Sequence, residues 1–357
     1  MANLFVASSL ACALLFLPVT SLMAQLVNLG VLTDVSGIYS TLSGEGSAEA
    51  ARMAVEDFGG TVLGREVKVF LGDHRANVVT AADIATEWFD NNEVGIIPDM
   101  PNSTIALGMQ KLAADRGKVS VTVSAGSTDL TGKQCRDTAF HWAYDTYSNT
   151  MNLERSMVDF GLSTWFFITA DYSFGWTMEE AASKAVTAAG GRVLGSVRHP
   201  LNAATLAPLL VFITDVDALG LEVAQGMTFI DGFYWDRTEE TRRWSKRFFD
   251  RRRTMPTMAH AGVYSAALHY LRAVQAAGTD DGQRVAAKMH ELPVEDFFAE
   301  KGEVRANGRM AHDMYLVQVK RPEAAEYAWD YYKILATIPG KVAFQPATET
   351  GCRLVTR

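Results

Sequence analysis

The sequence predicts a two-lobed α/β protein in which each lobe is a parallel sheet flanked by helices. Short, almost wholly apolar runs alternate with helix-length stretches whose apolar residues recur every three or four positions. This pattern is typical of buried parallel strands covered by helices on both faces. The alternation begins again after Tyr144–Thr146, and two such series in one chain of 357 residues indicate two lobes with a cleft between them.

Residues 1–24 are interpreted as a cleavable export signal. Leu4–Pro18 is apolar but short for a membrane span, and Ser21–Ala24 ends on a small residue suited to signal peptidase. We therefore expect the mature protein to begin at Gln25 and to lie in the periplasm. Its length suits two domains of ordinary size.

The first series supplies four strands and three helices. The strand candidates are apolar runs: Leu26–Leu32, Val67–Leu71, Val94–Ile97 and Val119–Val123. The helix candidates lie between them: Glu45–Phe58, Ala76–Asn91 and Ser103–Arg116. The polar loop Asp34–Ser40 follows the first strand, at the edge where open α/β sheets bind ligands.

The second series is less regular. It begins with strand Trp165–Thr169, helix Trp176–Ala189 and strand Arg192–Arg198. Leu201–Leu209 then supplies at most two helical turns before the apolar run Leu210–Thr214, although a parallel crossover normally needs a dozen or more residues. Three helices and two strands complete the chain: Glu239–Arg252, Ala261–Ala277, Gly282–Glu291, Asp313–Val319 and Tyr331–Ile338.

Charge and composition exclude several classes of function. The net charge of -8 argues against nucleic-acid binding, so Arg251–Arg253 is interpreted as the solvated end of a helix. The histidines show no metal-ligand spacing and no phosphate loop is present, so we expect neither a metal nor another cofactor. Cys135 and Cys352 remain after signal removal and can pair in an oxidising compartment, which would tether the C-terminal tail to the first lobe.

Several motifs in order resemble one known family. They are Gly30–Gly37, Ala48–Asp57 followed by a glycine pair, Ser124–Thr128, Asp171–Gly175 and Ala259–Gly278. Together they resemble the type I periplasmic substrate-binding proteins of ABC transporters, in the branched-chain amino acid (leucine/isoleucine/valine)-binding protein family. The resemblance covers nearly the whole mature chain.

The resemblance implies an organisation and a function. Residues 25–144 and 236–311 would form lobe 1, residues 145–235 and 312–340 lobe 2, and residues 341–357 a C-terminal tail. Three crossover segments would join the lobes. A monomer of this kind closes around a small carboxylate-bearing ligand and delivers it to an inner-membrane permease with its ATPase, without being an enzyme.

The resemblance also implies a set of ligand-binding residues. Hydroxyl groups and backbone N–H groups after first-lobe strands would hold the ligand carboxylate; the matching positions are Ser103, Ser124, Ala125 and Ser127. Asp34, Ser36 and Tyr39 would line the first loop, and Tyr172 would close from the second lobe. Serines and glycines after strands also serve as plain turn formers and helix caps.

The class of ligand stays open between an amino acid and an aromatic acid. Tyr234 lies in the aromatic stretch Gly232–Asp236 at the second crossover, where it could stack on a ligand ring or seal the lobe interface. An amino acid needs an acidic partner for its ammonium group in the second lobe. Asp215 and Asp217 are the candidates, but they can equally cap the next turn.

One departure from the family bears on the second lobe. Relatives carry a helix, a strand and a further helix where this chain passes from Leu209 to Leu210, so about forty residues are missing by that comparison. We expect a second lobe shortened near Leu209, with an internal strand and its covering helices lost. Such a loss could expose apolar surface, change the strand order or remove ligand contacts.

Two other functions remain as alternatives. A periplasmic sensor with the same clamshell would signal to a receptor instead of feeding a permease. A hydrolase would need a nucleophile, and Ser124, His74 and Asp99 follow neighbouring strands. The Gly-x-Ser-x-Gly turn that exposes such a nucleophile is absent, which disfavours the hydrolase.

Overall fold

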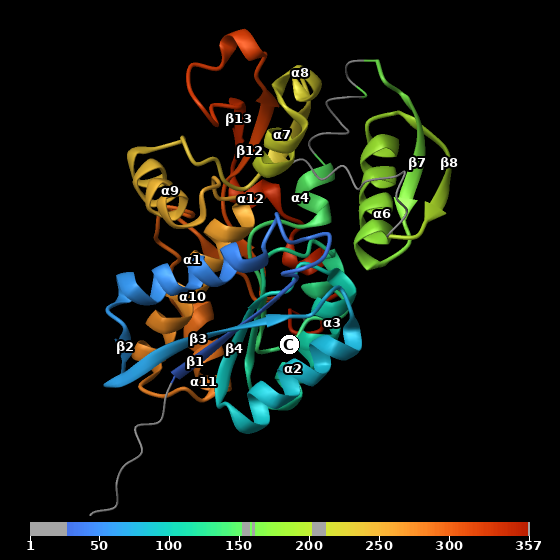
Figure 1. Cartoon of the computed structure of the whole chain (residues 1–357). Coiled ribbons are helices and arrows are strands. Elements are labelled where there is room, and N and C mark those ends of the chain that lie inside the picture. The colour runs from blue at the N-terminus through green and yellow to red at the C-terminus, as the bar shows by residue number, and fades with distance from the viewer. Residues whose placement is uncertain (1–26, 152–157, 159–160, 202–211, 356–357) are drawn as a thin grey trace, which may run out of the picture.

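The computed structural model describes residues 27–151, 158, 161–201 and 212–355 and has two lobes (Figure 1). The predicted two-lobed α/β class is confirmed, and the first lobe has the predicted parallel sheet flanked by helices. In the view of Figure 1 the first lobe is below and the second lobe above, and the chain passes between them near α4 (Thr146–Thr150). No helix in the described part of the chain has the length and apolarity needed to cross a membrane.

The first lobe contains a six-stranded sheet in the order β2-β3-β1-β4-β5-β6. Its strands are β1 (Val27–Thr33), β2 (Thr61–Val62), β3 (Arg65–Asp73), β4 (Val94–Asp99), β5 (Val119–Thr122) and β6 (Ala139–His141). All neighbours pair in parallel except the short β2, which is antiparallel to β3. Every residue of β1, β4 and β5 is buried, as their continuous apolar sequences predict.

Helices cover both faces of this sheet. α1 (Gly44–Phe58), α10 (Met258–Ala277) and α11 (Gly282–Glu291) share the larger hydrophobic cluster on one face. α2 (Val78–Asn91) and α3 (Ser103–Asp115) form the second cluster on the other. Helices α10 and α11 belong to this core although they follow the second lobe in sequence, so the first lobe is built from two separate stretches of chain.

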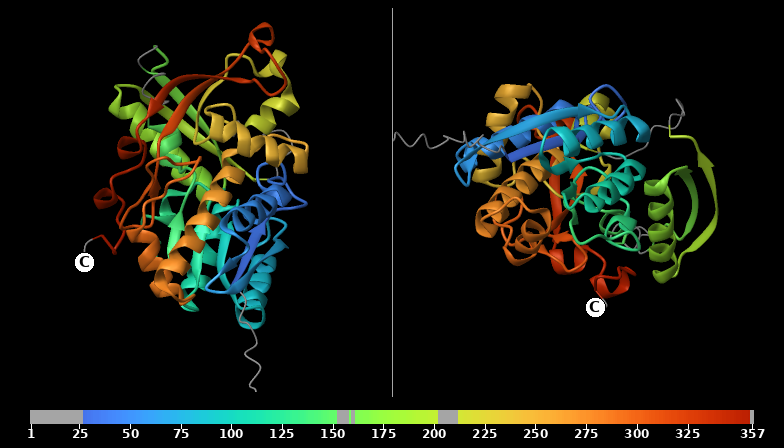
Figure 2. Two further views of the ribbon diagram at one scale, coloured as in Figure 1. Left: turned by 90° about the vertical axis from the view of Figure 1, so that its left-hand side faces the viewer. Right: turned by 90° about the horizontal axis from the view of Figure 1, so that it is seen from below.

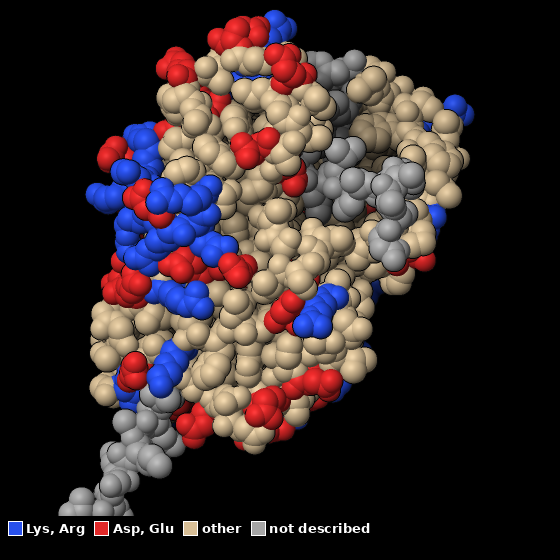
Figure 3. All heavy atoms as spheres, viewed as in Figure 1, with Lys and Arg blue, Asp and Glu red and all other residues tan. Residues whose placement is uncertain are grey.

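Ion pairs fasten α9 (Glu239–Arg252) to α1, and positive side chains gather over α9 (Figure 3). Arg247 forms two 2.8 Å hydrogen bonds with Asp57. Arg251 contacts Glu49 and Glu56, and Arg252 contacts Glu45. Arg251 and Arg252 thus form a partly exposed end of α9, as predicted, and also pair with acidic side chains of α1.

The second lobe does not form the single parallel sheet that we expected. Its strands divide into a parallel pair, β7 (Thr164–Ala170) and β8 (Arg192–His199), and a three-stranded antiparallel sheet in the order β13-β12-β9. The latter contains β9 (Thr228–Asp231), β12 (Met314–Val319) and β13 (Tyr332–Ile338). The division agrees with the loss of an internal strand between the two groups.

Helix α6 (Ser173–Ala188) covers the β7–β8 pair on one side, and the three elements project from the body of the molecule (Figure 2). Phe166 and Ile168 of β7 and Val197 of β8 are half or more exposed. α7 (Ile213–Leu219) and α8 (Leu221–Ala224) lie with the antiparallel sheet instead. The exposed side chains are the uncovered apolar surface that the shortened lobe predicts.

The apolar run Leu210–Thr214, which we interpreted as the strand that ends a parallel crossover, is not a strand where the structure describes it. Ile213 and Thr214 begin α7, because the Asp215 carboxylate accepts the Phe212 N–H and caps that helix. Leu201–Leu209, the expected short helical stretch, falls outside the described residues after Leu201.

Three crossover segments meet beside α4, and a buried arginine ties two of them together. Arg309 donates to the carbonyl oxygens of Trp142 and Tyr144, and its guanidinium lies 3.6 Å from the Asp145 carboxylate. His312 Nε2 lies 2.7 Å from the Ala143 carbonyl oxygen. The short strands β10 (Glu303–Val304) and β11 (Met310–Ala311) precede the third crossover, which contains His312.

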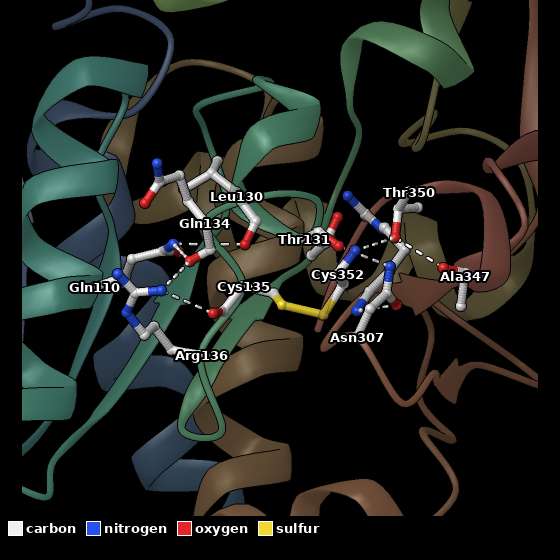
Figure 4. Close-up of a disulfide and its surroundings, with 11 residues drawn as sticks. Gln110, Leu130, Thr131, Gln134, Cys135, Arg136, Asn307, Ala347, Thr350 and Cys352 are labelled. Atoms are coloured by element: carbon white, nitrogen blue, oxygen red, sulfur yellow. Dashed lines mark hydrogen bonds between the residues drawn. A yellow bond between two sulfur atoms is a disulfide. The ribbon is translucent and has the colours of Figure 1, made fainter. Parts of the chain in front are cut away.

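The C-terminal tail returns to the first lobe. Short helix α12 (Gly340–Ala343) follows β13, and the Arg305 guanidinium donates to carbonyl oxygens of the tail, including those of Gly340 and Phe344. Cys352 then forms a disulfide with Cys135 (Figure 4). The 3-10 turns η1 (Thr128–Leu130), η2 (Pro322–Ala324) and η3 (Ala347–Glu349) complete the described elements.

Candidate ligand-binding site

The candidate site lies at the carboxyl edge of the first-lobe sheet. β3, the next long strand in sequence after β1, pairs with one edge of β1, and β4 pairs with the other edge. The strand order therefore reverses between β1 and β4. Ligands of open α/β sheets bind outside the strand ends at such a reversal. The loops that follow β1, β4 and β5 carry most of the predicted ligand-binding residues.

The loop after β1 folds over the carboxylate of Asp34. Asp34 is fully buried, and its Oδ2 accepts the Tyr39 N–H at 3.1 Å. A Cβ atom at Gly37 would lie 2.4 Å from that same oxygen, so only glycine lets the loop pass this closely. Ser36 is exposed and donates to Asp73 at 2.7 Å, which directs it toward the end of β3.

The loop after β5 is fixed through its own backbone. The carbonyl oxygen of Ser124 accepts the Tyr144 hydroxyl at 2.6 Å, and that of Ala125 lies 2.6 Å from His141 Nε2. The Ser127 N–H donates to the hydroxyl oxygen of Ser103, the first residue of α3. The structure thus brings Ser103, Ser124, Ala125 and Ser127 together in one buried loop cluster.

The N-terminus of α3 offers fewer free donors than expected. Asn102 caps the helix, and its side-chain oxygen accepts the N–H groups of Thr104 and Ile105 at 3.0 and 3.1 Å. A ligand at this end would therefore depend more on hydroxyl groups than on free backbone N–H groups.

The second lobe meets this cluster through α6. The Tyr39 hydroxyl donates to the Tyr172 hydroxyl at 3.2 Å, and the hydroxyl oxygens of Ser127 and Ser173 lie 2.9 Å apart. The Tyr172 ring stacks on Phe174. Burial raises the pKa of both Tyr39 and Tyr172, so the phenols are neutral donors and acceptors in the cell's pH range.

Tyr234 makes its contacts elsewhere. Its hydroxyl lies 3.4 Å from Asp330 Oδ1, and its ring packs against Trp235 and Tyr332. These residues belong to the second-lobe hydrophobic cluster. Tyr234 therefore packs within the second lobe, away from the loops around Ser127.

The second-lobe acids also have other partners. Asp215 caps α7, and Asp217 accepts the Tyr331 hydroxyl at 2.6 Å. Neither is brought to the first-lobe loops by a hydrogen bond. Sequence reasoning did not single out Ser173, although it follows Tyr172 directly in the motif Asp171–Gly175 and begins α6.

The arrangement does not make a serine nucleophile. The Ser124 hydroxyl donates to the Asp99 carboxylate, whereas His74 Nδ1 accepts the Ala76 N–H at 3.0 Å. No histidine in the described chain therefore stands between Ser124 and Asp99 as a base. The described residues also contain no group of three or more His, Cys, Asp or Glu that could hold a metal ion.

A family model described as periplasmic binding protein matches residues 26–210 and 202–325. The chain belongs to the periplasmic binding protein family. The two matched segments meet at residues 202–210, the place where the sequence comparison predicts missing residues. No curated protein matches the chain.

Solved structures of this family resemble the chain over nearly its whole length. A periplasmic binding protein from Burkholderia mallei is 40% identical, with a TM-score of 0.89 and coverage of 92% of this chain and 99% of that one. A branched chain amino acid ABC transporter periplasmic ligand-binding protein from Burkholderia xenovorans is 33% identical, with a TM-score of 0.83 and the same coverage. A solute-binding protein from Rhodopseudomonas palustris in complex with benzoate shares the fold at 17% identity, with a TM-score of 0.77 over 92% of this chain and 100% of that one.

Proposed function

We propose that this periplasmic binding protein is the solute-binding component of an ABC uptake system for a small carboxylate-bearing ligand. It would work in the periplasm as a monomer and pass its ligand to an inner-membrane permease with an ATPase. The observation that carries the proposal is the meeting of Ser103, Ser127 and Tyr39 of one lobe with Tyr172 and Ser173 of the other.

The chemistry of these groups suits an anion with an apolar body. Serine hydroxyls are neutral donors, so they can hold a carboxylate without a buried cation. The rings of Tyr172, Phe174 and Tyr144 supply apolar contact area beside them. We favour an aromatic or branched aliphatic acid, because Asp215 and Asp217, the two acids considered as partners for an ammonium group, are both engaged elsewhere.

Closure would couple ligand binding to the position of the second lobe. Tyr39–Tyr172 and Ser127–Ser173 join the lobes directly, so a ligand inserted between them gains contacts with both lobes when α6 approaches. Such differential affinity shifts the population toward the closed state, which a permease can recognise.

A thermal-shift screen of the mature chain from Gln25 tests the proposal. The ligands are leucine, valine, phenylalanine, benzoate, hydroxybenzoate and cinnamate. We expect one class to bind with a dissociation constant on the order of micromolar, about -8 kcal/mol, and to stabilise the fold by mass action. A folded protein that shifts with none of them contradicts the proposal.

Two hydroxyl deletions locate the site. Ser127→Ala and Tyr172→Phe should each weaken the affinity for the ligand found about tenfold, since each removes one hydrogen bond to an ionised carboxylate, worth about 1.5 kcal/mol. Tyr234→Phe is the matched control, because its hydroxyl bonds within the second lobe, and it should leave the affinity unchanged. A tenfold loss in Tyr234→Phe alone would move the site to the second crossover.

A further inference from the structure

Asp99 occupies a strained position beneath the loop that carries Ser124. It ends β4 and is fully buried. Asp99 and Met100 have φ angles of 91° and 63°, in the left-handed region that side-chain-bearing residues seldom adopt. Neighbouring strand ends hold this turn, because the Asp99 carbonyl oxygen accepts the Val123 N–H at 2.9 Å and the Met100 N–H donates to Leu32 at 3.0 Å.

The Asp99 carboxyl group is surrounded by hydroxyl groups and has no cation. The Ser124 hydroxyl donates to Oδ1, and the hydroxyl groups of Thr33 and Ser47 lie beside the carboxyl group. No ion pair to Asp99 is present among the described residues. Burial raises the pKa of Asp99 to about 6, against the opposing effect of these three hydroxyls.

One carboxyl oxygen of Asp99 is buried without a hydrogen-bond partner among the described residues. Asp99 Oδ2 and Ser47 Oγ both lack a hydrogen-bond partner among the described residues. The Ser47 hydroxyl can itself donate to an ionised carboxylate, so it does not require the proton. Protonation of Oδ2 would instead remove a buried negative charge that no cation among the described residues offsets. An ionised carboxylate leaves a buried negative charge supported by hydroxyls alone.

Ser124 connects this carboxyl group to the proposed site. Its side chain bonds to Asp99, and its main chain bonds to Tyr144 in the loop cluster that includes Ser127. The charge of Asp99 also raises the pKa of Tyr144, after the larger effects of burial and of Tyr39, so its field reaches the loop. A ligand carboxylate on this loop would place a second negative charge near the first in a poorly solvated region.

We propose that Asp99 is a positioning residue that takes up one solvent proton when a carboxylate ligand binds to the Ser124–Ser127 loop. The proton would reside on Oδ2, and Ser124 would keep its bond to Oδ1. The inference rests on the proposed function, because it requires a ligand with a carboxylate. Its consequence is that ligand affinity falls as pH rises.

Several other ionisable groups surround the loop. They comprise a carboxyl group after β1, histidines on β6, α10 and the loop after β3, and two phenols: Asp34, His141, His260, His74, Tyr39 and Tyr144. Burial lowers the pKa of His74, brings that of His260 to about 4 and lowers that of His141 well below its usual value. These histidines are therefore neutral where Asp99 titrates, and the phenols are neutral as well.

Calorimetric titrations with benzoate, and with leucine as a second probe, test the inference between about pH 5 and about pH 8. Carboxylic acid probes titrate near about 4 and stay ionised over this range. We expect the dissociation constant to be flat below about 6 and then to rise by up to about tenfold per pH unit, the limit for one linked proton. Titrations at neutral pH in two buffers of different ionisation enthalpy should give different observed binding enthalpies, and this difference measures the proton uptake.

Asp99→Asn is the decisive variant, because an amide is neutral and offers a donor where the protonated acid would. It should bind with the wild-type acidic-pH affinity across the range and take up no proton. Asp231→Asn is the matched control: Asp231 is also buried, with its pKa raised to about 7, but its carboxylate accepts the Phe233 N–H at the second-lobe end of β9. It should keep the wild-type pH dependence.

Each outcome decides between the two proposals. Wild-type binding that is independent of pH, or pH dependence that survives in folded Asp99→Asn, overturns the role of Asp99 alone. If neither probe nor any acid of the screen binds the folded wild type, the proposed function fails and the inference fails with it. Should Asp99→Asn not fold, proton uptake by the wild type and by Asp231→Asn still decides the question.

Discussion

The two lobes contain strands of similar sequence that differ in how well they are covered. β4 of the first lobe is paired on both sides, covered on both faces and buried throughout. β7 of the second lobe is equally rich in apolar residues but, among the described strands, pairs with β8 alone, and Phe166 and Ile168 are exposed by 56% and 59%. An apolar run therefore predicts a parallel strand, whereas its burial depends on neighbours elsewhere in the chain.

The second lobe nevertheless keeps its secondary structure because its pieces have partners outside their own sheet. α6 packs against α4 and also contacts α3 and η1 of the first lobe. The antiparallel sheet has its own hydrophobic cluster with α7 and α8. The two parts are thus attached to the molecule separately, and the α6 part is the one whose hydrogen bonds reach Ser127 and Tyr39.

The largest expected effect concerns the disulfide, which fastens the tail to the first lobe. Cys135 and Cys352 are 217 residues apart in sequence, so the bond removes much chain entropy from the unfolded state. The double variant Cys135→Ser/Cys352→Ser should lose about 3–5 kcal/mol of unfolding free energy in urea titrations. Reductant should lower the wild type to the same midpoint and leave the double variant unchanged; unaltered midpoints would show that other contacts already hold the tail.

A matched pair of isoleucines compares the two sheets directly. Ile96 in β4 is fully buried, and Ile96→Ala should cost about 2–5 kcal/mol because it leaves a cavity. Ile168 in β7 is mostly exposed, and Ile168→Ala should cost less than about 0.5 kcal/mol. Urea unfolding measures both. Similar losses would mean that β7 is covered in solution and that the second lobe is more complete than its two sheets indicate.

Much of the first lobe could be predicted because each element carries its own signal. Glu239–Arg252 and Gly282–Glu291 begin and end as predicted, since Thr238 and Asp281 cap their first turns. The short strands β6 and β9 were not predicted, because three or four residues show no period and depend on a neighbouring strand for their conformation. The same holds for the antiparallel pairing of β12, which no local pattern specifies.

The candidate site shows the same limit. Family resemblance indicated Ser127 and Tyr172, which the structure brings to a common cluster with Ser173. Asp99 was considered only as a member of a catalytic triad, because its bond to Ser124 crosses 25 positions of sequence. Spacing along the chain could suggest which strand ends are neighbours, but not which hydroxyl donates to which carboxylate.

The smallest effect on stability belongs to the exposed face of the β7–β8 pair. Ile168 lies in register with Val197, which is 50% exposed, and Phe166 lies on the same side of β7. The double variant Phe166→Thr/Ile168→Thr should change the unfolding free energy by no more than about 0.5 kcal/mol, since threonine suits a strand and little burial is lost. It should also reduce self-association in sedimentation at rising protein concentration, because an uncovered apolar face on a strand with one free edge favours contact between molecules.

Val186→Thr on the buried side of α6 is the control: it should lose stability without changing self-association. Loss of more than about 2 kcal/mol in the double variant would instead indicate that this face is packed against protein in the folded monomer.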